Sequence, residues 1–109
     1  MEELFHECGI AAVSHLDLEP ASLMVPGGDP TQTSRLIPGM LLDMQNRGQL
    51  AAGFTTYNPH RRQIIDTHKD VGGVAEVFRM NDPDNYLDLM SEYAGYAAIG
   101  HVRYATCGR

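Results

Sequence analysis

The chain has 109 residues, of which 43% are hydrophobic and 20% charged, a composition typical of one globular domain rather than of a disordered segment. Its formal net charge of −6 and its scattered basic residues argue against a nucleic-acid-binding surface. No apolar run approaches the length of a membrane span, and residues 1–7 are too acidic for a secretory signal. Two cysteines do not make a disulfide scaffold. We therefore expect a cytoplasmic protein with free thiols.

The first half of the chain predicts a strand, a loop and a helix. Small and branched residues over 8–13 suit a buried strand. Residues 17–33 contain several prolines and glycines, which predict a long loop. Apolar residues recur at helical spacing over 36–44. We expect Thr33 or Ser34 to cap that helix, because short hydroxyl side chains accept hydrogen bonds from its first free N–H groups.

The second half predicts a hairpin, two helices and a last strand. Residues 51–57 and 63–68 read as paired strands around an Asn-Pro-His turn. Residues 71–78 are ambiguous, because Gly72-Gly73 favours a turn and residues 74–80 favour a short helix. A longer helix begins at an Asp-Pro-Asp sequence and ends near Gly95. Residues 96–101 predict the last strand. This order indicates an α+β fold with helices on one face of a largely antiparallel sheet. That sheet would have an exposed edge, so we expect the chain to be part of a longer domain.

Cys8 is the residue whose side chain most clearly suggests a catalytic role. A cysteine is commonly a small buried hydrophobe, but Gly9 would let the backbone approach a ligand here. If residues 1–7 were removed, Cys8 would supply a thiol and a free α-amine, whose unperturbed pKa of about 8 suits a general base near neutral pH. One residue would then carry both nucleophile and base. We predict that residues 1–7 are a leader and that Cys8 is catalytic.

Two arginines and a threonine are candidate ligand-binding residues. Arg103 follows the last predicted strand, where its forked guanidinium could bind a substrate carboxylate or pair with a structural Asp. Thr106 could add a hydroxyl to the same group. Arg47 follows the first helix and either meets the helix dipole or orders a loop beside the site. We interpret His101 as a core residue. No Cys-x-x-Cys or His-x-x-x-His spacing indicates a metal site.

Four segments, in this order, resemble the class II, N-terminal-nucleophile glutamine amidotransferases. They are Cys8-Gly9-Ile10, Arg47-Gly48-Gln49-Leu50-Ala51-Ala52-Gly53, Gly73-Val74-Ala75-Glu76-Val77-Phe78 and Gly100-His101-Val102-Arg103-Tyr104-Ala105-Thr106. Gln49 and Tyr104 resemble the subgroup that passes ammonia to phosphoribosyl pyrophosphate in purine synthesis. Asparagine synthetases and glucosamine-6-phosphate synthases have other residues after Arg-Gly.

The resemblance implies a fold and roles for these residues. The fold would be a four-layer αββα sandwich, of which residues 8–109 form the N-terminal part. Cys8 would attack the side-chain amide of L-glutamine, and its α-amine would relay the proton to departing ammonia. Arg103 and Thr106 would hold the glutamine α-carboxylate, and Arg47 would order the loop around the thiol. No cofactor and no metal are implied.

The resemblance also implies partners, and two other interpretations stay open. The rest of the amidotransferase domain or an acceptor domain would accompany the chain as a second polypeptide, and we expect an oligomer. Alternatively, the chain is a non-catalytic module that keeps residues 1–7 and assembles with a partner chain. A third interpretation is a thiol hydrolase that uses Cys8 with a histidine, such as His101, and needs no processing.

Overall fold

One antiparallel sheet organises the molecule. A computed structural model describes residues 4–16, 23–45 and 49–107, with the backbone alone at 4–7, 49, 50 and 104–107. The four strands are β1 (Leu4–Ser14), β2 (Gln49–Tyr57), β3 (Ile65–Val71) and β4 (Ala97–Cys107). Their order in the sheet is β1-β4-β2-β3, and all neighbours are antiparallel. The last strand in the chain therefore lies between the first two.

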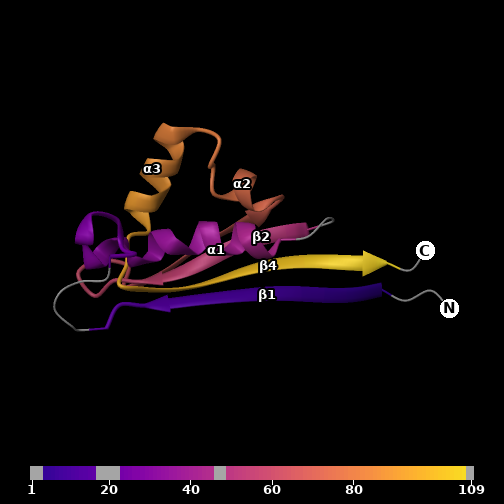
Figure 1. Cartoon of the computed structure of the whole chain (residues 1–109), viewed down its shortest axis with the longest axis horizontal. Coiled ribbons are helices and arrows are strands. Elements are labelled where there is room, and N and C mark those ends of the chain that lie inside the picture. The colour runs from indigo at the N-terminus through magenta and orange to yellow at the C-terminus, as the bar shows by residue number, and fades with distance from the viewer. Residues whose placement is uncertain (1–3, 17–22, 46–48, 108–109) are drawn as a thin grey trace.

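The helices gather on one face of this sheet. They are α1 (Leu36–Met44), α2 (Val74–Val77) and α3 (Pro83–Glu92), and the 3-10 turns are η1 (Pro26–Gly28) and η2 (Pro30–Arg35). In Figure 1 the helices lie above β1 and β4, and no element of the described residues lies below these two strands. The predicted α+β architecture is confirmed to this extent. Within the described residues, no helix is both long and apolar enough to cross a membrane.

The core lies between the sheet and the helices. Alternate residues of β2 and β4 point toward it, since successive strand residues face opposite sides. Phe54 and Val102 are fully buried there, together with Ile37 and Leu41 of α1. The helix approaches β4 closely at Gly100, where an added Cβ would overlap the Ile37 side chain. These contacts hold α1 directly over β1 and β4.

Several local predictions are confirmed. Strands β2 and β3 form the expected hairpin, with Tyr57 opposite Ile65. Helix α3 begins after Asp82, whose carboxylate accepts a hydrogen bond from the Asn85 N–H (3.3 Å), and Pro83 occupies its first position. Both features are local, because a capping side chain and a proline act within one turn of the chain.

The predicted cap of the first helix is wrong. Thr33 and Ser34 lie inside η2, and α1 begins at Leu36 without a side-chain cap. The Ser34 hydroxyl instead donates to the Tyr93 carbonyl (3.1 Å) and accepts from the Gly95 N–H (3.0 Å). A contact distant in sequence therefore takes the oxygen that the local pattern assigned to the helix.

The first and last strands are longer than predicted. β1 runs from Leu4 rather than from Cys8, and β4 continues beyond His101 to Cys107, because each strand supplies the other's hydrogen-bonding partners along the whole ladder. β1 is also not buried on both faces, since Ile10 is 69% exposed. The expected long loop contains the turns η1 and η2. Residues 17–22 lie outside the described part of the chain.

Candidate functional site

The sheet face that carries no helix holds the predicted nucleophile, and we call it the open face. Alternation and strand register define its members. They are, by strand, Cys8, Ile10, Ala12 and Ser14; Ala97, Ile99, His101 and Arg103; Ala51, Gly53, Thr55 and Tyr57; and Ile65, Thr67, Lys69 and Val71. Its charged members are Arg103 and Lys69, both positive in a chain of net charge −6. A negatively charged ligand is therefore favoured at their end of the face.

Cys8 and Arg103 are direct neighbours across the ladder. They are Cα partners in the β1–β4 register, and both side chains are exposed. Directly opposite residues in an antiparallel pair have Cβ atoms about 4.5–5.5 Å apart. On its other side Arg103 is paired with Ala51 of β2. A thiol and a forked cation, 95 positions apart in the sequence numbering, thus lie side by side.

The next row of the open face contains His101. It lies between Ile10 of β1 and Gly53 of β2, and it is half-buried. It is therefore not the core residue that we expected, because the core is on the other face. Its register makes it the diagonal neighbour of Cys8, a distance of about 7–8 Å between Cα atoms in such a pair.

Gly9 has a packing role that the sequence did not suggest. Its position faces α1, and a Cβ there would lie 2.6 Å from the Met44 sulfur and 2.9 Å from Val102 Cγ2. A Cβ at this position would require the Met44 and Val102 side chains to shift, whereas glycine lets β1 pass beneath the end of α1 without such a shift. The residue beside Cys8 consequently seats the strand against the helix, which fixes the backbone that carries the thiol.

Two other predicted site residues are not tested. Arg47 lies outside the described residues. Thr106 belongs to β4 and is opposite Phe5, but its side chain is also outside the described part. The structure therefore brings Cys8 and Arg103 together, without placing Arg47 or the Thr106 hydroxyl relative to them.

The residues before Cys8 continue the strand. The backbone of residues 4–7 pairs with that of residues 104–107, from Leu4 opposite Cys107 to Glu7 opposite Tyr104. In this form the nitrogen of Cys8 belongs to a peptide bond, and the thiol has no α-amine beside it. The arrangement is that of a chain before any removal of residues 1–7.

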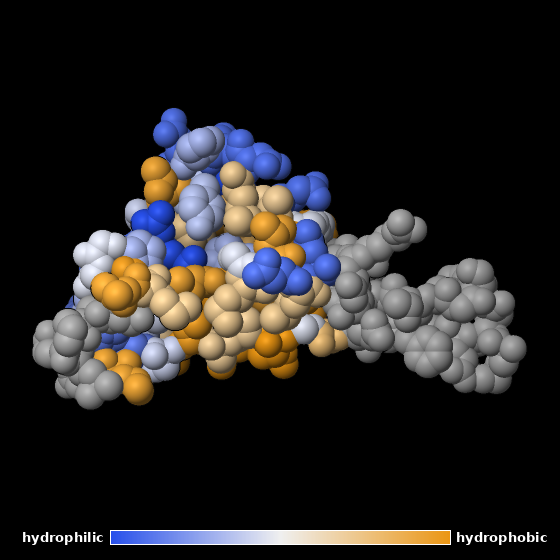
Figure 2. Space-filling view, viewed as in Figure 1, coloured by the Kyte–Doolittle hydropathy of each residue, from blue (hydrophilic) through white to orange (hydrophobic). Residues whose placement is uncertain are grey.

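An apolar hollow occupies the other end of the open face. Its volume is about 490 Å³, and its walls include Ala12, Tyr57, Ile65 and Ile99. Ile65 and Ile99 are 60% and 58% exposed, and orange side chains mark this lower edge of the molecule in Figure 2. Sequence reasoning missed the hollow, although the alternation of Ala97 and Ile99 with the buried residues Ala98 and Gly100 is its signal. Elsewhere in the described chain, no three His, Cys, Asp or Glu side chains lie together as metal ligands would.

Comparisons with known proteins find similar sequences. No protein-family model matches the chain, and no solved structure matches it significantly. The amidophosphoribosyltransferase of Archaeoglobus fulgidus is 37% identical over 102 residues, covering 94% of this chain and 17% of the relative. Amidophosphoribosyltransferase 1, chloroplastic, of Arabidopsis thaliana is 42% identical over 81 residues (74% and 12%), and the human amidophosphoribosyltransferase is 33% identical over 103 residues (94% and 17%).

The class that the motifs and these relatives define is that of the class II glutamine amidotransferases, as the resemblance predicted. The chain spans less than a fifth of the length of these relatives. Within the class, it is related to the amidophosphoribosyltransferases along nearly its whole length.

Proposed function

We propose that this chain is the nucleophile-bearing part of a glutamine amidotransferase domain and that Cys8 releases ammonia from glutamine. The observation that carries the proposal is the register that sets Cys8 opposite Arg103 on the open face. A thiol beside a guanidinium suits a substrate that has both an amide to be attacked and a carboxylate to be held.

The proposed reaction begins with removal of residues 1–7, which frees the α-amine of Cys8. That amine takes the thiol proton as sulfur bonds to the amide carbon of glutamine. The proton then passes to the departing nitrogen, the C–N bond breaks, and ammonia leaves a thioester on Cys8. Water hydrolyses the thioester to glutamate and restores the thiol.

Substrate binding is assigned to three side chains. Arg103 would bind the glutamine α-carboxylate through two hydrogen bonds, a geometry that its planar fork matches. Thr106 would add a hydroxyl to the same end of the substrate. Arg47 would order the loop beside the thiol. The two positive charges at this end of the open face, Arg103 and Lys69, support an anionic substrate group there.

The open face would be the interior of a larger fold. We propose that a second sheet packs on it and completes a four-layer αββα sandwich. The exposed apolar side chains Ile10, Ile65 and Ile99 support this, because a soluble protein rarely leaves such a patch uncovered. Sheets packed face to face lie about 10 Å apart, which leaves space for a small substrate at the polar end.

The whole protein would pass its ammonia to an acceptor. We propose phosphoribosyl pyrophosphate as that acceptor, since the relatives are named amidophosphoribosyltransferases. The rest of the domain and the acceptor site would lie outside these 109 residues, on the same or a second polypeptide, in an oligomer.

The test of the proposed function combines two measurements on the purified complete protein. Intact mass should show the loss of residues 1–7, and incubation with glutamine should release ammonia and glutamate. A protein of unprocessed mass that nevertheless hydrolyses glutamine would exclude the N-terminal-nucleophile mechanism. A protein of unprocessed mass without activity would favour the non-catalytic module, which the continuous strand through residues 4–7 also fits.

One observation favours a second candidate, a thiol hydrolase that needs no processing. His101 is the diagonal neighbour of Cys8 on the open face and could act as its base. His101→Gln would then abolish activity in an unprocessed enzyme. In the proposed amidotransferase the same change should leave most of the activity, because the α-amine is the base.

A further inference from the structure

Strand β3 forms one edge of the sheet, and its outward backbone groups already have partners. Among the described residues it pairs with β2 only, so alternate N–H and C=O groups point away from the sheet. The Thr67 N–H donates to the Asp66 carboxylate (2.9 Å), and the Val71 N–H donates to the Asp70 carboxylate (2.8 Å). Both N–H groups therefore lie on the outer edge, where the side chain of the preceding residue binds each of them.

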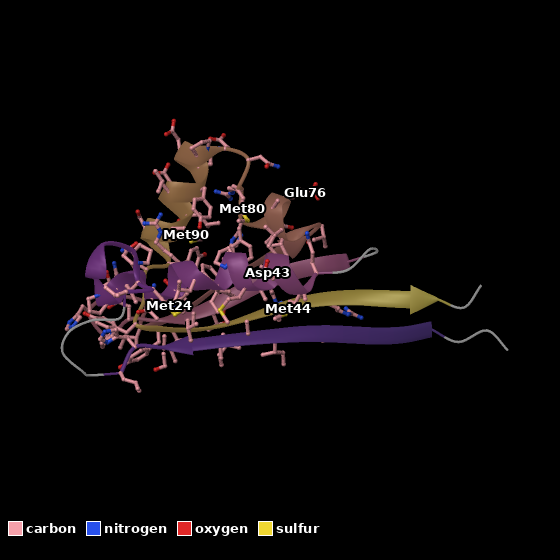
Figure 3. All side chains as sticks on the ribbon, viewed as in Figure 1. Met24, Asp43, Met44, Glu76, Met80 and Met90 are labelled. Atoms are coloured by element: carbon pink, nitrogen blue, oxygen red, sulfur yellow. The ribbon has the colours of Figure 1, made fainter. Side chains whose placement is uncertain are left out.

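A tyrosine from the helical layer binds a third group of this edge. The Tyr93 hydroxyl donates to the Thr67 carbonyl (3.4 Å), and the Tyr93 ring packs on that of His68, with centroids 5.6 Å apart. Tyr93 follows α3, which the buried side chain of Met90 holds in the core. Figure 3 labels Met90 near the end of this helix that approaches the sheet. At Thr67, both the donor and the acceptor of the edge are therefore occupied.

The side chains of β3 on the open face would otherwise favour pairing with another strand. Ile65 and Val71 are 60% and 79% exposed and lie at the two ends of this strand of seven residues. An exposed edge strand with apolar side chains is a template for a further strand, and natural proteins counter it with charged residues or covered backbone groups. The contacts of Thr67 and Val71 with the two aspartates have this form.

The sequence of β3 would allow it to pair with a second copy of itself. An antiparallel pair aligns the outward backbone groups of two strands, which on β3 belong to alternate residues from Ile65 to Val71. The register centred on His68 meets this condition and uses all seven residues. It places Ile65 of one copy opposite Val71 of the other at both ends, so the exposed apolar side chains would cover each other.

The two aspartates oppose this pairing in two ways. In the register centred on His68, Asp66 of one copy lies opposite Asp70 of the other, and like charges directly opposite destabilise a strand pair. The carboxylates also bind the Thr67 and Val71 N–H groups that a second strand would need. Pairing would have to release these N–H groups and bring carboxylates of the two copies together.

We propose that Asp66 and Asp70 close the edge of β3 to antiparallel pairing with a second copy of this chain, through the hydrogen bonds that they accept and through their charge. Tyr93 adds to the closure at the Thr67 carbonyl. This role is independent of the proposed function, because it concerns an edge of the sheet and not the site beside Cys8. Removal of the carboxylates should therefore turn the edge into an interface.

The experiment measures the mass of the complete protein by light scattering over a range of concentrations. Asp66→Ala with Asp70→Ala removes both acceptors, and the mass should then rise with concentration, whereas that of the parent stays constant. Asp84→Ala with Asp88→Ala removes two exposed acids of α3, the same change in net charge, and should behave as the parent. Circular dichroism checks that each variant is folded. If the double variant at the edge does not fold, Asp70→Ala at its exposed position replaces it and should also associate.

Two further variants separate the hydrogen bonds from the charge and identify the strand. Asp66→Asn with Asp70→Asn keeps an oxygen acceptor for each N–H group and removes only the charge, so it should associate less than the alanine variant. Val71→Lys, added to the alanine variant, places a lysine on the edge opposite Ile65 of the second copy. It should abolish the association, because a charged side chain on an edge strand disfavours pairing.

Three results would overturn the inference. The first is an alanine variant whose mass equals that of the parent at every concentration. The second is association that Val71→Lys does not reduce, since the contact would then lie outside the edge of β3. The third is equal association of the asparagine and alanine variants, because the hydrogen bonds to Thr67 and Val71 would then have no part in the closure.

Discussion

The two faces of the sheet are built from alternate residues of the same strands, yet they differ in almost every respect. On the covered face, Ala52, Phe54 and Val102 have no exposed surface. On the open face, Ile10 and Ile99 are more than half exposed, and Cys8 and Arg103 are exposed neighbours. Moving one position along β4, from Val102 to Arg103, changes a core residue into a candidate substrate ligand.

This difference shows which residues can be changed for stability and which for function. The covered face packs against the helices and carries most of the core. The open face combines a polar end, with Cys8, His101 and Arg103, and an apolar end with the hollow around Ile99. Because successive residues of a strand face opposite sides of the sheet, core residues and candidate site residues alternate along the same strand. Hydrophobicity alone does not distinguish them, since both faces carry apolar side chains.

The largest expected effect is on the polar end of the open face. Cys8→Ala in the complete, processed protein should reduce glutamine hydrolysis by several orders of magnitude, because it removes the thiol that would form the thioester. Ammonia release measures the effect. Cys107→Ala, at the other cysteine of the chain, is the control and should keep its activity. Retained hydrolysis in Cys8→Ala would exclude Cys8 as the nucleophile.

The next effect is on the covered face. Phe54 packs edge-on against Phe78, with ring centroids 5.0 Å apart, and is fully buried. Phe54→Ala should reduce the free energy of unfolding by about 3–5 kcal/mol, since it removes a large buried side chain and leaves a cavity. Urea denaturation measures the change. A cost below 1 kcal/mol, on the scale of a surface substitution, would contradict this packing.

A substitution of Ile99 tests whether the open face is covered in the complete protein. If the proposed second sheet covers it, Ile99→Ala in the complete protein should cost about 2–4 kcal/mol, as for a core residue. If the face remains uncovered, the cost should stay near 0.5 kcal/mol. The measurement is again urea denaturation, and the second outcome would contradict the four-layer sandwich.

Arg103 tests the substrate contact itself. Arg103→Lys keeps the charge and loses the planar fork, so glutamine binding should weaken by about 1–3 kcal/mol, seen as a higher KM. Lys69→Ala, which removes the other positive charge of the open face from a neighbouring row, should raise the KM by a smaller factor than Arg103→Lys. An unaltered KM in Arg103→Lys would indicate a structural arginine.

The smallest expected effect is on how stability depends on pH, through Tyr93 on the covered side of the sheet. Burial raises the pKa of Tyr93 above its ordinary value of 10.0, Asp66 and Glu92 raise it further, and Arg61 opposes them. The folded protein therefore holds this proton more tightly than the unfolded chain. The resulting stability is present below pH 10 and is lost as the pH rises through the raised value.

Tyr93→Phe removes this group from the titration. Between about pH 9 and pH 11 the free energy of unfolding should fall less steeply in Tyr93→Phe than in the parent protein. Urea denaturation at several pH values gives the two slopes. Equal slopes would mean that the tyrosine is as acidic in the folded as in the unfolded chain.

The success of sequence reasoning depended on how local each signal was. The Asp82 cap and the hairpin of β2 and β3 were predicted, because their causes lie within a few residues. The cap at Ser34 was wrong because its hydroxyl bonds to Tyr93 and Gly95, about 60 residues away. Local preference could not reveal that competing partner.

In the candidate site, too, the sequence predicted local features but not contacts between distant segments. Cys8 and Arg103 were each selected from their own segments, and the resemblance to amidotransferases gave them roles. Their direct pairing follows from the register of β1 on β4, which joins the two ends of the described chain. Register depends on the whole hydrophobic pattern of both strands, so neither segment predicts it alone.

The position of β4 in the sheet has a consequence for the order of folding. Among the described residues, β4 is the last strand and separates β1 from β2, so the β1–β4 ladder can form only after residues 97–107 have left the ribosome. Pairing over so long a sequence separation requires closure of a large loop, which slows folding. We therefore expect the β2–β3 hairpin to form early and the β1–β4 ladder to form later. During synthesis the predicted nucleophile would wait on its strand for the arginine that lies opposite it.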